Sequence, residues 1–259
     1  MFTIGFIGLA GSGKDTSCNY MADVFFSLGF PINKTRFALP LKTIARLCFG
    51  DMCDDRDKKE VLVPFGVEKI HAAVNMCVMY YKEVLITNEM QSQEYLVSSF
   101  RKKASSLLTS HAVDNRMKLS PRMLQQLIGT DLFRNHVRES FWVDLVRSRL
   151  PKGKVNFLSD VRFPNEVLMC DALVVVKRDC AQPVANHVSE SLSKEIILSE
   201  QPEMMLKEKY GYGGRVYVVE NNGQLWQLQD TIARLSLLVR DNAIEDKKLP
   251  LGLPFTLES

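Results

Sequence analysis

The amino-acid sequence predicts a three-layer α/β/α protein with a mostly parallel sheet and a helical insertion. Two observations predict this fold. Short β-prone apolar runs alternate with helical segments, and parallel strands are joined by helices that cover both faces of a sheet. In the middle of the chain, from Pro64 to about Leu108, helical spacing continues without a strand pattern. Ligands of parallel sheets bind beyond the carboxyl ends of the strands, so residues that directly follow strands are candidates for a functional site.

Strands are expected where short apolar runs end in glycine or polar residues, at 2–7, 155–159, 173–176 and 216–219. Helices are expected at 14–28, from 38 to about 50, at 120–150 with a break near Gly129, and at 224–240. Pro40 and Pro121 lie in the first turns of two of these helices, and Ser120 is typical of an N-cap.

The insertion contains one strongly amphipathic helix, because apolar residues recur at helical spacing between Val67 and Leu85. A polar break at 88–93 and a second, weaker helix follow. We therefore expect a core formed by 1–50 and 120–240, a helical insertion at 51–119, and a surface tail at 241–259.

The composition excludes several classes of protein. The 259 residues are 46% apolar and 24% charged, which suits one or two globular domains. A net charge of +3 does not favour binding to nucleic acid or to a membrane surface. No apolar stretch reaches the ~20 residues of a membrane-spanning helix, and residues 1–7 lack the features of a signal peptide. With six cysteines that form no Cys-x-x-Cys pair, the sequence predicts reduced thiols and a cytoplasmic location.

Directly after the first predicted strand, residues 8–14 match the phosphate-binding pattern Gly-x-x-x-x-Gly-Lys. Glycines let successive backbone N–H groups point at a phosphate, and the N-terminus of the next helix adds the positive end of its dipole. Lys14 brings a mobile positive charge to the β- and γ-phosphates. The sequence therefore predicts a P-loop whose nucleotide-binding residues are Gly11, Ser12, Gly13, Lys14, Asp15 and Thr16.

The metal-binding position departs from this pattern. Ser or Thr normally follows the lysine and contacts Mg²⁺, but here Asp15 follows Lys14 and Thr16 comes next. Asp15 could contact the metal through water, or Thr16 could supply the hydroxyl. Both residues are therefore candidates for the metal site.

Several further blocks of sequence occur in the order found in one kinase family. They are Gly-Ser-Gly-Lys-Asp-Thr at 11–16, Phe-Ala-Leu-Pro-Leu-Lys at 37–42, Gln-Leu-Ile-Gly-Thr-Asp at 126–131, Phe-Trp-Val at 141–143, Ser-Asp-Val-Arg at 159–162, Asn-His-Val-Ser-Glu at 186–190 and Asn-Asn-Gly-Gln-Leu at 221–225. Together they resemble the deoxynucleoside monophosphate kinases of tailed bacteriophages over nearly the whole chain. The resemblance implies that ATP, with Mg²⁺, donates its γ-phosphoryl group to a deoxynucleoside monophosphate. The products would be ADP and a diphosphate for dNTP supply in DNA synthesis. If the protein is viral, as the resemblance implies, its cytoplasmic location would be that of the host cell.

A monophosphate kinase needs cations for the acceptor phosphate, and arginine suits phosphate because its planar fork donates two hydrogen bonds. The candidates are Lys42, Arg56, Arg122 and Arg162. Asp160 and Arg162 follow a predicted buried strand, where a pair of opposite charges has little structural reason to lie. We expect Lys14, Asp160 and Arg162 to be the catalytic residues. Asp160 would hold the water shell of the metal or bind the substrate, and Arg162 would bridge the two phosphates.

The base and sugar need a recess. The family resemblance favours Trp142 as a residue that stacks on the base, although a tryptophan in a helix is usually a core residue. Glu166 is expected to contact the sugar or the base, and His187 is a weaker candidate for a substrate contact. The helical segment at 51–119 occupies the place where monophosphate kinases bind the acceptor and close over it. Its apolar stripes could also pair in a homodimer.

Two other interpretations stay open from the sequence. One is a different P-loop small-molecule kinase, which acts on a nucleoside or a coenzyme precursor. The other is a nucleotide-dependent switch protein, although no guanine-specific Asn-Lys-x-Asp follows the P-loop. The choice of acceptor separates the two kinases, and turnover that requires an acceptor separates a kinase from a switch.

Overall fold

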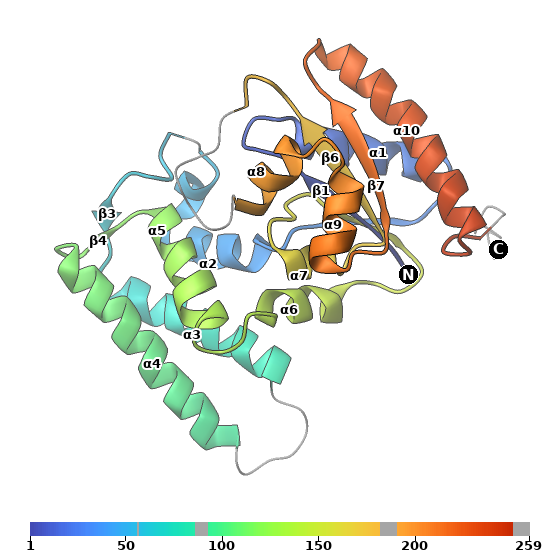
Figure 1. Cartoon of the computed structure of the whole chain (residues 1–259). Helices are drawn as coiled ribbons and strands as arrows, with labels where there is room; N and C mark the ends of the chain where they lie inside the picture. Colours follow the sequence, from blue (N-terminus) through green and yellow to red (C-terminus); the bar gives the residue numbers. More distant parts are fainter. Residues whose placement is uncertain (56, 86–92, 182–190, 251–259) are drawn as a thin grey trace, which may run out of the picture. The chain divides into compact units, whose positions relative to one another are not determined.

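The computed structural model describes residues 1–55, 57–85, 93–181 and 191–250 (Figure 1). The chain folds into two compact units. Met1–Phe37 and the part of the chain from Leu150 onward form the first, which we call the α/β unit. Ala38–Arg149 form the second, which we call the helical unit.

The α/β unit contains a five-stranded sheet in the order β2-β5-β1-β6-β7. Its strands are β1 (Phe2–Ile7), β2 (Ile32–Thr35), β5 (Val155–Leu158), β6 (Ala172–Lys177) and β7 (Arg215–Glu220). Its helices are α1 (Lys14–Ser27), α7 (Pro164–Val167), α8 (Ser191–Leu198), α9 (Pro202–Tyr210) and α10 (Leu225–Glu245). Every pair of neighbouring strands is parallel. The predicted three-layer α/β/α fold with a parallel sheet is therefore confirmed.

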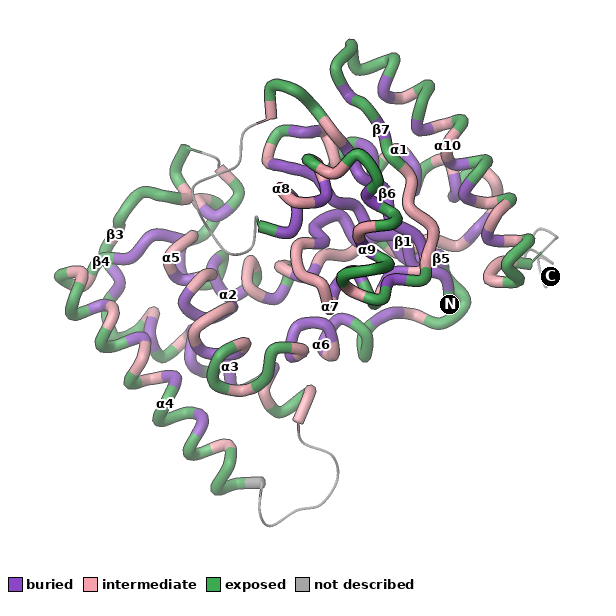
Figure 2. Tube along the Cα trace, in the orientation of Figure 1, coloured by how far each residue is buried: buried purple, intermediate pink, exposed green. Residues whose placement is uncertain are grey.

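Helices cover both faces of this sheet. On one face α1 and α10 pack against each other, and on the other face α8 contacts β6 and α9 contacts β7 (Figure 1). All six residues of β1 are buried, which is typical of a central strand between two helical layers (Figure 2). Phe2, Ile4 and Phe6 of this strand belong to the apolar cluster that α1 and α10 complete. The alternation of side chains along β1 thus supplies the core of both faces.

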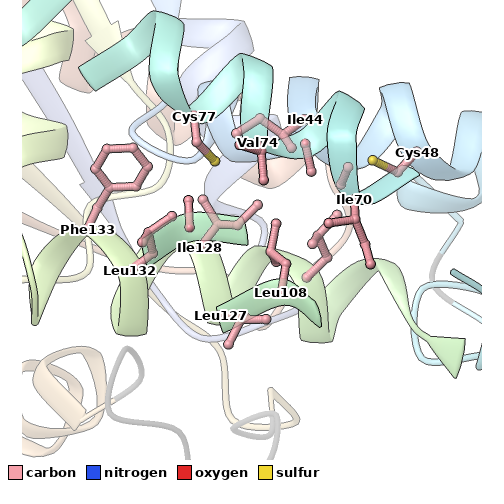
Figure 3. Packing of buried hydrophobic residues seen from close by; sticks show 14 of the residues in the cluster. Ile44, Cys48, Ile70, Val74, Cys77, Leu108, Leu127, Ile128, Leu132 and Phe133 are labelled. Atoms are coloured by element: carbon pink, nitrogen blue, oxygen red, sulfur yellow. The ribbon is translucent and has the colours of Figure 1, made fainter. Parts of the chain in front are cut away.

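The helical unit consists of packed helices and one short antiparallel ladder. Its elements are α2 (Leu39–Phe49), a 3₁₀ turn η1 (Gly50–Cys53), β3 (Val63–Pro64), α3 (Val67–Leu85), α4 (Gln93–Asp114), β4 (Lys118–Leu119), α5 (Pro121–Gln126), a π-helical stretch η2 (Leu127–Arg134) and α6 (Phe141–Arg149). Figure 3 shows the core of this unit, where Ile44 of α2, Val74 of α3 and Leu108 of α4 lie in one apolar cluster. Ser120 caps α5 as expected, because its hydroxyl accepts a hydrogen bond from the N–H of Met123 at 3.2 Å.

The boundaries of the two units differ from the boundaries expected from the sequence. Residues 38–50 and 120–149, which we expected in the core with the P-loop, belong to the helical unit. The physical reason is that their apolar residues, such as Leu124 and Leu127, lie in the same cluster as those of α3 and α4. At the other end, α10 continues to Glu245, so the first residues of the expected tail are helical. Residues 251–259 lie outside the described part of the chain.

Among the residues that the structure describes, no helix is long and apolar enough to cross a membrane. All six cysteines are free thiols, five of them buried, and Cys180 is exposed. The burial of five cysteines agrees with the expectation that they pack as small apolar residues. Burial raises the pKa of the Cys18 thiol to about 12 and that of Cys48 to about 11.

Candidate active site

The centre of the sheet is a topological switch point. β1 pairs with β5 on one side and with β6 on the other, so the chain leaves β1 and β5 toward opposite edges of the sheet. Gly5 of β1 is opposite Leu158 of β5, so the loop after β1 and the residues after β5 start side by side. Open parallel sheets bind ligands in the crevice beyond the strand ends at such a point. The P-loop (Gly8–Lys14) and Asp160 both lie there.

The P-loop has the backbone conformation that phosphate binding requires. Gly11 and Gly13 have φ angles of +80° and +94°, a region that favours glycine. The N–H of Ser12 donates to the carbonyl oxygen of Leu9 at 3.1 Å, which closes the turn, and α1 begins at Lys14. The N-terminus of this 14-residue helix thus follows directly on the loop. Among the residues that the structure describes, the buried hydroxyl of Ser12 has no hydrogen-bond partner.

Asp15 and Thr16 are exposed residues in the first turn of α1. Asp15 forms an ion pair with Arg36, where Oδ1 and Nη2 are 3.6 Å apart. Within the described ranges, no group of three His, Cys, Asp or Glu side chains could hold a metal ion on its own. An exposed carboxylate and a hydroxyl beside a phosphate loop fit Mg²⁺, which is usually held by one or two protein groups together with substrate phosphates.

Arg36 is a cation at this site that the sequence reasoning missed. It directly follows β2, whose short sequence Ile-Asn-Lys-Thr has no apolar pattern to reveal an edge strand. Its neighbour Phe37 also contributes to the site, because the backbone N–H of Phe37 donates to Oδ1 of Asp160 at 2.7 Å. The residues after β2 therefore contact both the P-loop helix and the residue that follows β5.

Asp160 is held in a fixed position. Asp160 is only 8% exposed, and the hydrogen bond from the N–H of Phe37 orients one carboxylate oxygen. The N–H of the next residue, Val161, donates to the carbonyl oxygen of Phe6 at 3.2 Å, which ties this turn to β1. The structure thus brings Lys14 and Asp160 to the carboxyl ends of neighbouring strands, as expected from the sequence.

Glu166 supports the turn that carries Arg162. Its Oε2 accepts hydrogen bonds from the N–H groups of Arg162 at 2.8 Å and Phe163 at 3.3 Å, where α7 begins. Glu166 is only 2% exposed. The expected contact between Glu166 and the sugar or base is not supported by this geometry, because the carboxylate is buried and accepts backbone N–H groups. Glu166 instead fixes the backbone at Arg162.

The ends of β6 and β7 also contact the P-loop. Nη1 of Arg178 donates to the carbonyl oxygen of Gly11 at 3.5 Å. Nδ2 of Asn221 donates to the carbonyl oxygen of Ser12 at 2.8 Å. Sequence reasoning did not assign roles to these two residues, although their position directly after predicted strands is a signal that could have identified them.

Two of the expected acceptor-binding cations lie in the helical unit. Nζ of Lys42 is 3.9 Å from Oδ1 of Asp54, which also pairs with Arg46. Nε of Arg122 is 2.5 Å from Oε1 of Glu60, and the side chain of Arg122 is about one-quarter exposed. Both cations are partly accessible, so an anionic ligand could replace their present partners. Arg56 and His187 lie outside the described residues.

Trp142 is part of the core of the helical unit. It is 2% exposed, and its Nε1 donates to the carbonyl oxygen of Gly129 at 2.9 Å. The rings of Tyr80, Phe133 and Phe141 lie edge-on to it. The expected stacking of Trp142 on a base is not supported by this geometry, because other side chains surround the indole.

A parallel sheet, a P-loop at its switch point and a carboxylate and an arginine after the neighbouring strand define a phosphotransferase of the P-loop kind. Comparison with known proteins identifies the family. A family model for deoxynucleotide monophosphate kinases matches residues 3–194, and the chain belongs to this family. It is also 28% identical over 176 residues to the deoxynucleoside-5'-monophosphate kinase of Escherichia phage T5. That alignment covers 63% of this chain and 69% of the phage protein. These matches confirm the resemblance noted in the sequence and the prediction of a kinase that acts on deoxynucleoside monophosphates.

Proposed function

We propose that this kinase transfers the γ-phosphoryl group of ATP to a deoxynucleoside monophosphate, which yields the diphosphate and ADP. The family match supports the type of reaction. The observation that carries the proposal is the P-loop at the switch point of the sheet, with Asp160 fixed beside it by Phe37. A kinase of this kind works in the cytoplasm with small-molecule nucleotides as its partners, and its product supplies dNTP synthesis.

The donor phosphates would bind at the P-loop. Backbone N–H groups between Gly11 and Lys14 would surround the β-phosphate, and Nζ of Lys14 would move from the carbonyl oxygen of Leu9, now 3.4 Å away, to the phosphates. Mg²⁺ would neutralise the charge of the β- and γ-phosphates. Asp15 and Thr16 are the protein groups that we propose for it. If Asp15 turned toward the metal, its ion pair with Arg36 would break. Arg36 would then be available to contact the transferred phosphoryl group.

The α/β unit is proposed as the kinase core, and the helical unit as the carrier of acceptor-binding cations. Arg162 is proposed to stabilise charge on the transferred phosphoryl group, with Asp160 positioned to bind the metal's water shell or the substrate. Lys42, Arg122 and Arg56 are proposed for the acceptor phosphate, where arginine can donate two hydrogen bonds to one phosphate. Phosphoryl transfer needs no covalent intermediate on the protein, since positioning and charge stabilisation suffice.

The experiment is a turnover panel. The protein is mixed with ATP and Mg²⁺, each deoxy- and ribonucleoside monophosphate is offered separately, and ADP is measured. We expect ADP only in the presence of a deoxynucleoside monophosphate, with a loss of at least about 100-fold in kcat for Lys14→Ala and Arg162→Ala. Arg101→Ala is a matched control, because Arg101 is an exposed residue of α4 bonded to Asn75. ADP formation that needs no acceptor would indicate a switch protein, and turnover with another small molecule would indicate a different kinase.

A further inference from the structure

Asn221 is a buried polar residue that follows β7 and reaches the P-loop. Its backbone N–H donates to the carbonyl oxygen of Lys177, the last residue of β6, at 2.8 Å. Its side-chain Nδ2 donates to the carbonyl oxygen of Ser12 at 2.8 Å, across a sequence separation of 209 residues. Asn221 is only 6% exposed. Through its backbone and its side chain, Asn221 thus connects the ends of β6 and β7 to the loop that follows β1.

The hydrogen bond acts on a particular peptide unit. The carbonyl group of Ser12 and the N–H of Gly13 belong to the same peptide, which is trans. In a planar trans peptide the C=O and N–H bonds point in opposite directions. Asn221 holds the carbonyl oxygen on its own side, so the N–H of Gly13 points away from Asn221. The orientation of a phosphate-binding N–H is therefore set by a residue that does not itself face the phosphate.

The amide of Asn221 lies close to this peptide. Gly13 has a φ of +94°, and a Cβ atom there would lie 2.4 Å from Nδ2 of Asn221. The amide therefore packs directly against the Cα of Gly13. With the amide of Asn221 in its present orientation, a flipped peptide would turn the N–H of Gly13 toward the NH₂ group of Asn221, which places two donors together. It would also point a carbonyl oxygen at the phosphate, where like partial charges repel each other.

We propose that Asn221 is a positioning residue for the donor nucleotide, which keeps the Ser12–Gly13 peptide in the orientation that binds phosphate. The proposal rests on the proposed function to the extent that it takes the P-loop as the ATP site. If the role of Asn221 were merely structural, its replacement would lower the stability of the protein and weaken the binding of both substrates to the same extent. A positioning role weakens the binding of ATP and leaves the binding of the monophosphate unchanged.

The test is a calorimetric titration of the full chain with Mg·ATP, together with KM values for ATP and for the deoxynucleoside monophosphate. Asn221→Ala removes the donor, and Asn221→Asp keeps the size but places an acceptor against the carbonyl oxygen of Ser12. We expect the Kd for ATP to rise about tenfold with alanine and further with aspartate, since a hydrogen bond of this kind corresponds to about that factor. The KM for the monophosphate should stay within about twofold.

Asn222→Ala is the matched control. Asn222 is the next residue, and its Oδ1 accepts a hydrogen bond from the N–H of Asp179 at 2.9 Å. This variant should bind ATP like the wild type. The inference would be overturned by wild-type ATP affinity in both Asn221 variants, or by an equal loss of ATP and monophosphate binding. Failure of both variants to fold would also overturn it in favour of a structural role. If the wild-type protein binds ATP but phosphorylates no monophosphate, the proposed function is wrong. The calorimetric test still decides the role of Asn221 in that case.

Discussion

Replacement of Trp142 distinguishes a core residue from a base-stacking residue. The indole is 2% exposed and lies among three aromatic rings, and its N–H is bonded to Gly129. Truncation of a buried aromatic residue to alanine costs about 3–5 kcal/mol of unfolding free energy. The carbonyl oxygen of Gly129 would lose its partner, which costs about 1–3 kcal/mol more. Trp142→Phe keeps a ring and loses mainly the hydrogen bond, so we expect a loss of about 2–4 kcal/mol.

Thermal unfolding measures this effect. In a chain of this size 1 kcal/mol shifts the Tm by about 2–4 °C, so Trp142→Phe should lower the Tm of the protein by about 5–15 °C. The KM for the deoxynucleoside monophosphate should change less than about twofold in the protein that remains folded. Trp226→Phe is the control, because Trp226 is 66% exposed on α10 and its replacement should change stability by less than about 0.5 kcal/mol. An unchanged Tm for Trp142→Phe with a KM raised about tenfold would refute this reasoning and restore the stacking role.

Three further predictions concern the site and the thiols. Asp160→Asn keeps an acceptor for the N–H of Phe37 and removes the charge, so it should fold normally and lose at least about 100-fold in kcat. Asp160→Ala should in addition lower stability by about 1–3 kcal/mol, and equal stability of the two variants would contradict the role of that hydrogen bond. Glu166→Ala should lower stability in urea by about 1–3 kcal/mol and lower kcat through displacement of Arg162, and an effect on the monophosphate KM alone would argue instead for substrate contact. Burial raises the pKa values of Cys18 and Cys48 above the ordinary value of a thiol, about 9.0, so the unfolded chain loses thiol protons first. The stability that these thiols contribute is therefore complete below about pH 9 and is lost as the pH rises toward about 11–12, which urea titrations at pH 8 and 10 can measure.

The elements with strong local signals could be predicted from the sequence. The apolar run of β1, the glycines of the P-loop and the cap at Ser120 each determine their structure through nearby atoms. β2 was missed because Asn33 and Lys34 interrupt its apolar character and the strand lies at the edge of the sheet. α9 was also missed, although Pro202 at its start and Gly211 after its end, with a φ of +69°, are local signals for a helix.

The parts that depend on tertiary packing could not be predicted in the same way. Nothing in the sequence near Leu124 indicates that α5 packs with α3 and α4 rather than with the sheet. For Trp142 the family resemblance outweighed the ordinary preference of tryptophan for the core, and the structure favours the core. The role of Glu166 could have been suspected, because Pro164 and Glu166 occupy the first and third positions of a helix, as in a capping box. Asn221 and Ser12 are too far apart in sequence for any local pattern to connect them.

The transfer of the γ-phosphoryl group can be followed with a label. ATP labelled at the γ-phosphorus is mixed with Mg²⁺, the wild-type protein and one deoxynucleoside monophosphate, and the labelled products are separated. We expect the label to move to the deoxynucleoside diphosphate in step with ADP formation, and Lys14→Ala and Asp160→Asn to abolish this transfer while both proteins stay folded. Label found only in inorganic phosphate, or transfer that persists in Lys14→Ala, would contradict the claim that this P-loop site performs the kinase reaction.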